Sequence, residues 1–163
     1  MDVTVIRHGT AEDRAATDAD RALTPRGRAE VAAAGDRLAS RGGTPPDSII
    51  ASPLLRARQS AEVVARRVGF TGPIQIDEAL VPDGEPAAVR DLLAGLGERR
   101  HVVLVAHEPI LSAVCSLLTG APVASLHKAE IVSMTSGQVD AAKALDPAAG
   151  SGGRGPFAIR FRV

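Results

Sequence analysis

Apolar residues follow two spacings along this chain, and the spacing separates strands from helices. Short uninterrupted apolar runs predict buried strands, whereas apolar residues that recur every three or four positions predict amphipathic helices. The predicted strands are Val3–Arg7, Ser48–Ala51, Ile74–Ile76, His101–Ala106, Ile131–Met134 and Phe157–Val163. A segment with helical spacing follows each of the first four strands, so strands and helices alternate until the last two strands.

Prolines and glycines mark the limits of the predicted helices. Two helices start with a hydroxyl residue followed by proline, which is the form of an N-cap and a first-turn proline. The four helices are predicted to begin at Thr24-Pro25, Ser52-Pro53, Pro86 and Pro109, and to end at Gly42-Gly43, Gly69, Leu96 and Gly120. The segment Asp140–Pro156 is rich in Ala, Gly, Ser and Pro and predicts a loop between the last two strands.

This order of elements predicts an α/β fold. Alternating strands and helices form a mainly parallel sheet with helices on both faces, which is a three-layer α/β/α sandwich. Apolar and polar residues alternate in Phe157–Val163, as expected for an antiparallel strand at the edge of the sheet. With 163 residues, the chain is long enough for one sizeable core, so we predict a single domain over residues 1–163.

The composition of the chain argues against some classes of binding partner and indicates a cellular compartment. The chain has 19 basic and 19 acidic residues, three Phe, and no Trp or Tyr. A zero charge balance with few aromatic rings argues against nucleic acid and anionic membrane as partners. The single cysteine, Cys115, excludes an internal disulfide, and neither a signal peptide nor a membrane span is apparent in the sequence. We therefore expect a cytoplasmic protein, and a monomer because its surface offers no strong interface.

Polar residues of one chemical kind follow three of the predicted strands. Arg7 and His8 stand at the end of the first strand, and His107 directly follows His101–Ala106. Arg56 lies in the first turn of the helix after the second strand. Open α/β sheets bind ligands beyond the carboxyl ends of their strands, so these two arginines and two histidines are expected at one rim.

That set of residues predicts a phosphoryl-group site. Guanidinium groups match the geometry of phosphate oxygens, and the helix N-termini at Pro53 and Pro109 add partial positive charge. A neutral imidazole can attack phosphorus, and neighbouring arginines favour the neutral form. The attacking atom could be Nε2 or Nδ1. Arginines beside the histidines would repel a cation, so no metal is expected, and no organic cofactor is implied.

Three motifs, in order, resemble those of the histidine phosphatase superfamily, which includes the phosphoglycerate mutases. The motifs are Ile6-Arg7-His8-Gly9, Ser52–Ala61 and Val105–Pro109. By this resemblance His8 is the residue that becomes phosphorylated, while Arg7, Arg56 and His107 hold the phosphoryl group. The resemblance also implies a phosphoglycerate mutase-like fold.

Shorter segments are similar to one branch of that superfamily, the SixA-type phosphohistidine phosphatases. These segments are Asp18–Gly27 and Leu80–Gly84. We expect Gly9 to turn the chain beside the phosphate. Arg21 is expected to line the substrate entrance, and Asp18 either to pair with it or to act as a proton donor.

The proton donor is not apparent in the sequence. Glu78, Asp83 and Glu85 follow the third strand, where larger members of the superfamily carry a carboxylate, but Asp83 and Glu85 also suit a cap of the next helix, and that interpretation is favoured. A phosphohistidine needs a dedicated acid less than an alkyl phosphate does. The absence of long insertions predicts an open site.

The first functional hypothesis is therefore hydrolysis of phosphohistidine on a protein, such as a histidine phosphotransfer domain in signal transduction. The alternatives are a phosphatase for small sugar or nucleotide phosphates on the same scaffold, and a phosphate-binding module without turnover. The intact set of Arg7, His8, Arg56 and His107 argues against the last of these.

Overall fold

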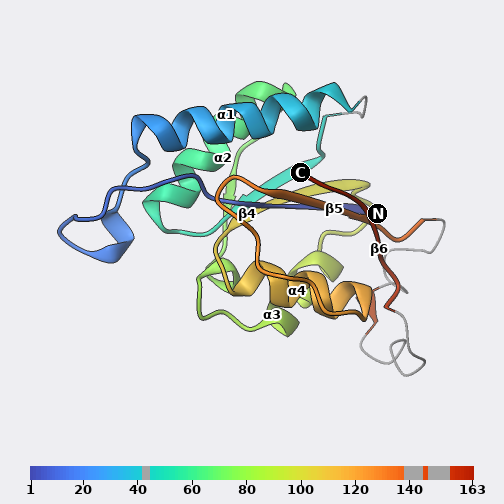
Figure 1. Cartoon of the computed structure of the whole chain (residues 1–163). Coiled ribbons are helices and arrows are strands. Elements are labelled where there is room, and N and C mark those ends of the chain that lie inside the picture. The colour runs from blue at the N-terminus through green and yellow to red at the C-terminus, as the bar shows by residue number, and fades with distance from the viewer. Residues whose placement is uncertain (42–44, 138–144, 147–154) are drawn as a thin grey trace.

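A six-stranded sheet forms the middle of the computed structural model, which describes residues 1–41, 45–137, 145–146 and 155–163 (Figure 1). The strands are β1 Asp2–Arg7, β2 Ser48–Ala51, β3 Gln75–Ile76, β4 His101–Ala106, β5 Ile131–Thr135 and β6 Ala158–Arg162. The helices are α1 Pro25–Ser40, α2 Leu55–Val68, α3 Pro86–Ala94 and α4 Ile110–Thr119, with short 3-10 turns η1 Asp18–Asp20 and η2 Glu78–Leu80. Gly42-Gly43 and most of the predicted loop Asp140–Pro156 lie outside the described residues.

The strand order is β3-β2-β4-β1-β5-β6, and the first four strands in that order are parallel. β5 pairs antiparallel with β1, and β6 pairs antiparallel with β5 at the edge of the sheet. The predicted mainly parallel α/β fold with an antiparallel C-terminal edge strand is confirmed. This topology places β1 and β4 side by side in the middle, where both strands are buried on both faces.

Helices cover both faces of the sheet, which completes the predicted three layers. α1 and α2 pack on one face, and α3 and α4 pack on the other (Figure 1). Side chains of β1 alternate between the two cores: Val3 and Val5 belong to the α3 and α4 side, and Ile6 to the α1 and α2 side. The fully buried Ile6 alone contributes roughly 1.5–3 kcal/mol through removal of its side chain from water.

The limits of all four helices lie within two residues of the predicted signals. Thr24 caps α1, since its side chain accepts a hydrogen bond of 2.9 Å from the backbone N–H of Gly27. The prediction that Ser52-Pro53 caps α2 is wrong, because α2 begins at Leu55 and its N-cap residue is Leu54. α3 ends at Ala94 rather than at Leu96.

The edge strand β6 departs from the alternation that its sequence suggests. A register shift between Ser133 and Met134 pairs these neighbours with Phe161 and Ile159, so β6 carries one extra residue. Such a bulge moves the pleat by one position, and residues on either side no longer face the same way. As a result Ile159 is 45% exposed, whereas Phe161 is half-buried.

Candidate active site

Two histidines meet because β1 and β4 are neighbouring parallel strands. Arg7 pairs in register with Ala106, so the residues that follow each strand, His8 and His107, leave the sheet together. The two ring centroids are 4.9 Å apart, and the rings are tilted by 56°. His8 is 8% exposed and His107 is 2% exposed, so both imidazoles are buried at the carboxyl end of the sheet.

The backbone sets the tautomer of His8. Its Nδ1 lies 2.7 Å from the carbonyl oxygen of Gly9. A carbonyl oxygen only accepts hydrogen bonds, so Nδ1 carries the proton and Nε2 carries the free lone pair. Of the two attacking atoms left open by the sequence, the geometry therefore favours Nε2.

Gly9 allows this close fit because its lack of a side chain lets the segment after β1 pass directly against α1. A Cβ at Gly9 would lie 2.4 Å from the carbonyl oxygen of Gly27 and 2.8 Å from a methyl group of Val31. The backbone N–H of Gly9 donates to Ser60 Oγ at 3.4 Å, which ties the turn to α2. This packing requires a residue without a side chain at position 9, and the role of Gly9 in turning the chain beside a phosphate stays a prediction.

Burial and positive neighbours keep both histidines neutral. The pKa of His8 is lowered from 6.5 to about 4, mainly by burial and further by the charges of Arg56 and Arg7. The pKa of His107 is lowered to about 3, again mainly by burial, with His8 and the arginines adding to the effect. At neutral pH both rings are uncharged, which is the form in which imidazole is a nucleophile.

Two arginines complete the cluster. Arg56, 5% exposed, extends from the first turn of α2, and Arg7 extends from the end of β1. Arg7 Nη1 donates to the carbonyl oxygen of Leu126 at 2.6 Å, which anchors its guanidinium. Arg7 Nε and His107 Nδ1 are buried and have no hydrogen-bond partner among the described residues. Buried polar atoms without a hydrogen-bond partner are rare in folded proteins. A bound anion would supply the acceptor that Arg7 Nε lacks.

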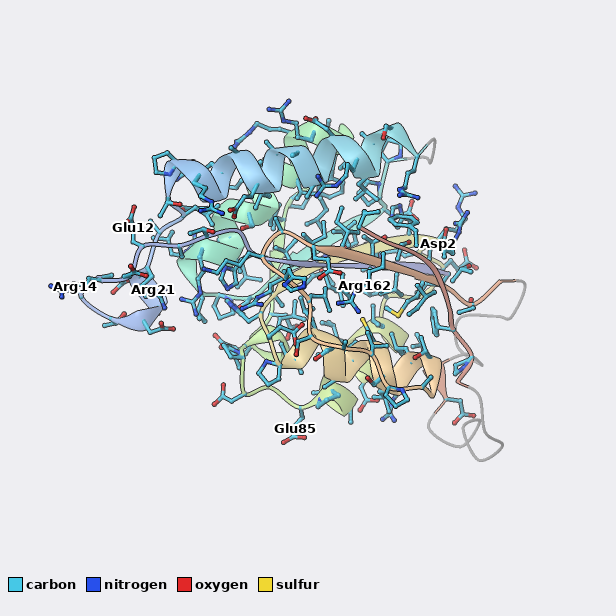
Figure 2. All side chains as sticks on the ribbon, viewed as in Figure 1. Asp2, Glu12, Arg14, Arg21, Glu85 and Arg162 are labelled. Atoms are coloured by element: carbon cyan, nitrogen blue, oxygen red, sulfur yellow. The ribbon has the colours of Figure 1, made fainter. Side chains whose placement is uncertain are left out.

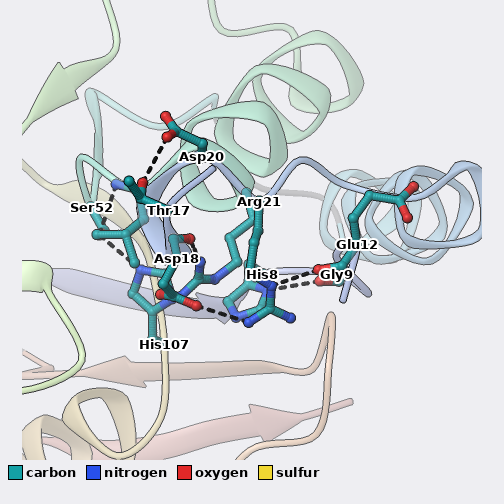
Figure 3. Close-up of polar contacts among 11 residues, drawn as sticks. His8, Gly9, Glu12, Thr17, Asp18, Asp20, Arg21, Ser52 and His107 are labelled. Atoms are coloured by element: carbon teal, nitrogen blue, oxygen red, sulfur yellow. Dashed lines mark hydrogen bonds and ion pairs between the residues drawn. The ribbon is translucent and has the colours of Figure 1, made fainter. Parts of the chain in front are cut away.

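Asp18 and Arg21, which Figure 3 draws with the two histidines, form the outer part of the site because their side chains are partly exposed. The Asp18 carboxylate accepts hydrogen bonds of 2.9 Å from both Arg21 and Arg56, and its backbone carbonyl accepts another from Arg56 at 2.7 Å. The hydrogen bonds from Arg21 and then Arg56 lower the pKa of Asp18. An ionised Asp18 occupies the donors of Arg56 that a phosphoryl group would use and is a poor proton donor.

The other candidate proton donors have no link to this cluster. The side chains of Glu78, Asp83 and Glu85 are exposed and form no hydrogen bond or ion pair with any described residue. Glu85 occupies the N-cap position of α3, but its side chain does not cap the helix. Figure 2 shows Glu85 pointing away from the body of the molecule.

The structure also adds residues that the sequence did not single out. Ser52 Oγ lies 2.8 Å from His107 Nε2, so the serine expected to cap α2 holds the second histidine instead (Figure 3). Ser60 connects Gly9 to α2 from inside that helix. The backbone N–H of Ala129 lies 3.1 Å from the carbonyl oxygen of Arg7, so the segment before β5 closes over the end of β1. The motifs contain Ser52 and Ser60, but no spacing rule marks them as contacts of the site.

Within the described ranges, no group of three or more His, Cys, Asp or Glu side chains is placed to hold a metal ion. None of the described helices combines the length and the apolar character needed to cross a membrane.

The site has the features of an α/β protein that binds phosphoryl groups: a neutral buried histidine with a free Nε2 beside two arginines at the strand ends. Comparison with known proteins identifies the family. The family model of the histidine phosphatase superfamily (branch 1) matches residues 3–81, and the chain belongs to this superfamily. An uncharacterized protein of Picosynechococcus sp. is 38% identical over 149 residues, which cover 84% of this chain and 86% of that protein.

Solved structures show the same fold. The protein histidine phosphatase SixA in complex with tungstate matches with a TM-score of 0.84 at 23% identity, covering 100% of this chain and 96% of that one. A mycobacterial glucosyl-3-phosphoglycerate phosphatase in complex with VO3 matches with a TM-score of 0.65 at 22% identity, covering 82% and 92%. The catalytic roles of Arg7, His8, Arg56 and His107 stay predictions that the geometry allows.

Proposed function

We propose that this protein hydrolyses phosphohistidine on a protein substrate through a covalent phospho-His8 intermediate. The observation that carries the proposal is the state of the carboxylates. Asp18, the carboxylate bonded to Arg56, is held ionised by two arginines, and the candidates after β3 form no link to the site. With none of these described carboxylates poised as an acid, the site suits a leaving group that needs little help from one.

In the first step His8 Nε2 attacks phosphorus in line with the bond that breaks. The P–N bond of the substrate cleaves, its electron pair stays on the leaving imidazole nitrogen, and that imidazole departs with a proton it already carries. Arg7, Arg56 and the partial charges at nearby helix N-termini stabilise the equatorial oxygens of the transferring group. Asp18 has to release Arg56 for this contact to form.

In the second step water attacks the phosphorus of phospho-His8. The new P–O bond forms as the P–Nε2 bond breaks, and the electron pair returns to Nε2, which restores neutral His8 and yields inorganic phosphate. The Gly9 carbonyl holds Nδ1–H in both steps, so the same ring face serves attack and release.

The proposed partner is a phosphorylated protein, such as a histidine phosphotransfer domain. The side chain of Asp18 is 61% exposed and that of Arg21 is 30% exposed, so the outer part of the site is open to solvent. A phosphohistidine side chain on a protein surface can enter from that side. The match to SixA, named as a protein histidine phosphatase, supports this choice at the level of the fold.

A phosphatase for small phosphate esters is the second candidate. The match to glucosyl-3-phosphoglycerate phosphatase favours it, because that protein has a similar fold and is named for a small ester. The two candidates differ in the demand for an acid: a sugar alkoxide is a poor leaving group and needs a proton.

Phosphate release in EDTA separates these functions. A histidine-phosphorylated phosphotransfer protein and a panel of sugar and nucleotide phosphates are each offered to the wild-type protein, to His8→Ala and to His127→Ala. The last variant is the matched control, since His127 is an exposed histidine in a loop. We expect release from the phosphoprotein by the wild type and by the control, and none by His8→Ala.

Faster release from one small ester than from the phosphoprotein would move the function to the second candidate. Release that His8→Ala leaves intact would overturn the proposed nucleophile.

A further inference from the structure

A cavity lies at the opposite end of the sheet from the two histidines. Its volume is about 280 Å³, and its walls include residues at the start of β1 and β4 and the end of α1. Asp2 belongs to this end, and Figure 2 shows it far across the molecule from Arg21. The cavity and the candidate active site are thus separated by the length of the central strands.

The floor of the cavity is polar where the sheet face is otherwise apolar. Thr4 and Ser133 are 0% and 4% exposed and lie on the same face as Ile6 and Ile131, which belong to the apolar core under α1 and α2. Both hydroxyl residues line the cavity. Hydroxyl groups at core positions need hydrogen-bond partners, so their arrangement is informative.

Three side chains on this floor, those of His101, Thr4 and Ser133, are joined by two hydrogen bonds in series. Thr4 Oγ1 donates to Ser133 Oγ at 3.2 Å, and His101 Nε2 lies 3.1 Å from Thr4 Oγ1. With the single proton of the Thr4 hydroxyl directed at Ser133, His101 Nε2 is the donor to Thr4, in the tautomer that carries its proton on Nε2. Ser133 then receives a hydrogen bond, and its own proton has no acceptor among the described residues. The chain ends on a buried donor that lines the cavity.

The rim is cationic. Arg41 and Arg100 line the cavity, and neither guanidinium forms an ion pair within the described part of the chain. Arg41 lies over the ring of Phe161, 4.1 Å from its centroid, which holds it at the rim. The acidic residues nearby are engaged: Asp2 pairs with Arg160, and the Asp47 carboxylate accepts two backbone N–H groups at the start of β4.

Apolar side chains complete the walls, among them Leu38, Val68 and Phe161. We propose that this cavity binds a small organic anion, whose carboxylate or phosphate head accepts hydrogen bonds from Ser133 and Arg41 and whose apolar body lies against these side chains. Donors without acceptors above an apolar wall are the features of a pocket for such a ligand. The volume limits the ligand to a small molecule, such as an aromatic or short aliphatic acid.

The test is a titration of the ¹⁵N-labelled full-length protein, followed by NMR at constant ionic strength. Sodium benzoate is one probe and inorganic phosphate is the other, so the two arms separate an amphipathic acid from a bare phosphate. We expect benzoate to shift the amides of Thr4, His101 and Ser133 in a saturable manner. The His8→Ala variant should bind benzoate like the wild type, which separates this site from the active site.

Variants of the cavity make the assignment specific. Arg41→Gln removes the rim charge and is expected to weaken benzoate binding about tenfold, as is typical for loss of a charge-assisted hydrogen bond. Ser133→Ala removes the hydroxyl donor on the floor of the cavity and should also weaken benzoate binding. Arg37→Gln removes an exposed charge from the last turn of α1, outside the cavity, and is the matched control for Arg41 at the C-cap of that helix.

Saturable shifts at the cavity that Arg41→Gln and Ser133→Ala reduce would support the proposal. If inorganic phosphate shifts the same amides as benzoate does, the cavity binds an anion, and the proposed contact with an apolar body is wrong. Linear shifts without saturation, or shifts that Arg37→Gln weakens as much as Arg41→Gln, would overturn it.

Discussion

Burial of two neutral histidines makes the stability of this protein depend on acid. His8 and His107 have pKa values of about 4 and about 3 in the folded chain, against 6.5 for an unperturbed histidine. Below the unfolded pKa the unfolded chain binds protons that the folded chain does not. Stability is therefore fully present above about pH 6.5 and is lost as the pH falls towards the folded pKa values.

The size of the effect follows from these values. At about pH 5 an unfolded histidine is protonated roughly thirty times more often than not, whereas each buried ring is still mostly neutral. Each histidine therefore lowers the free energy of unfolding by about 2 kcal/mol between about pH 7.5 and about pH 5, and the two together by about 4 kcal/mol. That loss is a large part of the roughly 5–15 kcal/mol that stabilises a typical domain.

Carboxylates contribute little in this window. The pKa is lowered for four of them, Asp18, Glu30, Asp47 and Glu130. A carboxylate with a lowered pKa stabilises the fold above its unfolded value, here 3.8 for Asp and 4.5 for Glu, and its contribution falls only as the pH approaches that value. A measurement that stops at about pH 5 therefore reports mainly on the histidines.

The assay is urea unfolding at the two pH values in buffers free of phosphate, because a bound anion would add its own stabilisation. His107→Gln keeps a side-chain amide for the hydrogen bond with Ser52 but cannot be protonated, so its loss of stability should fall to about half of the wild-type value. An NMR titration of the imidazole Cε1–H signals measures the two pKa values directly. A wild-type loss of less than about 1 kcal/mol, or a His8 or His107 imidazole that titrates near 6.5, would refute the reasoning.

Two further predictions concern the contacts around the histidines. Asp18→Asn weakens the competition for Arg56, so calorimetry should find tungstate bound about two- to fivefold more tightly, as expected for one partly exposed ion pair. Asp20→Asn is the exposed control, and equal effects of both variants would contradict the idea. Ser52→Ala leaves His107 Nε2 buried without its partner and should lower the free energy of unfolding by about 1–3 kcal/mol. Unchanged urea unfolding would show that His107 finds another partner.

The fold could be predicted from the sequence because its signals are local. Continuous apolar runs mark β1 and β4, and a threonine-proline pair marks the start of α1. Pairing across the sheet is not local, and this explains the failures. The bulge in β6 depends on its register against β5, and that register reversed the expected exposure of Ile159.

The inner site was predictable for a related reason. His8 and His107 each follow a parallel strand directly, and the strand-end rule needs only the sequence to bring them together. Side-chain contacts from other elements needed coordinates. The hydrogen bond of Ser52 with His107 and the double ion pair of Asp18 depend on how loops fold over the sheet edge, for which the sequence contains no spacing signal.

The burial of His8 has two consequences, one for its protonation state and one for the stability of the fold in acid. Burial and two arginines lower the pKa of His8 and keep it in the neutral form that the proposed attack on phosphorus requires, and the same burial makes the fold sensitive to acid. Asp18 pairs with Arg56 and Arg21 while no phosphoryl group is bound. Its negative charge offsets part of the positive charge and so reduces the repulsion between the arginines. A phosphoryl group that displaces Asp18 supplies the same negative charge closer to Nε2. In the proposed mechanism one anion replaces another at Arg56, so Arg56 has an anionic partner both before and after the substrate binds.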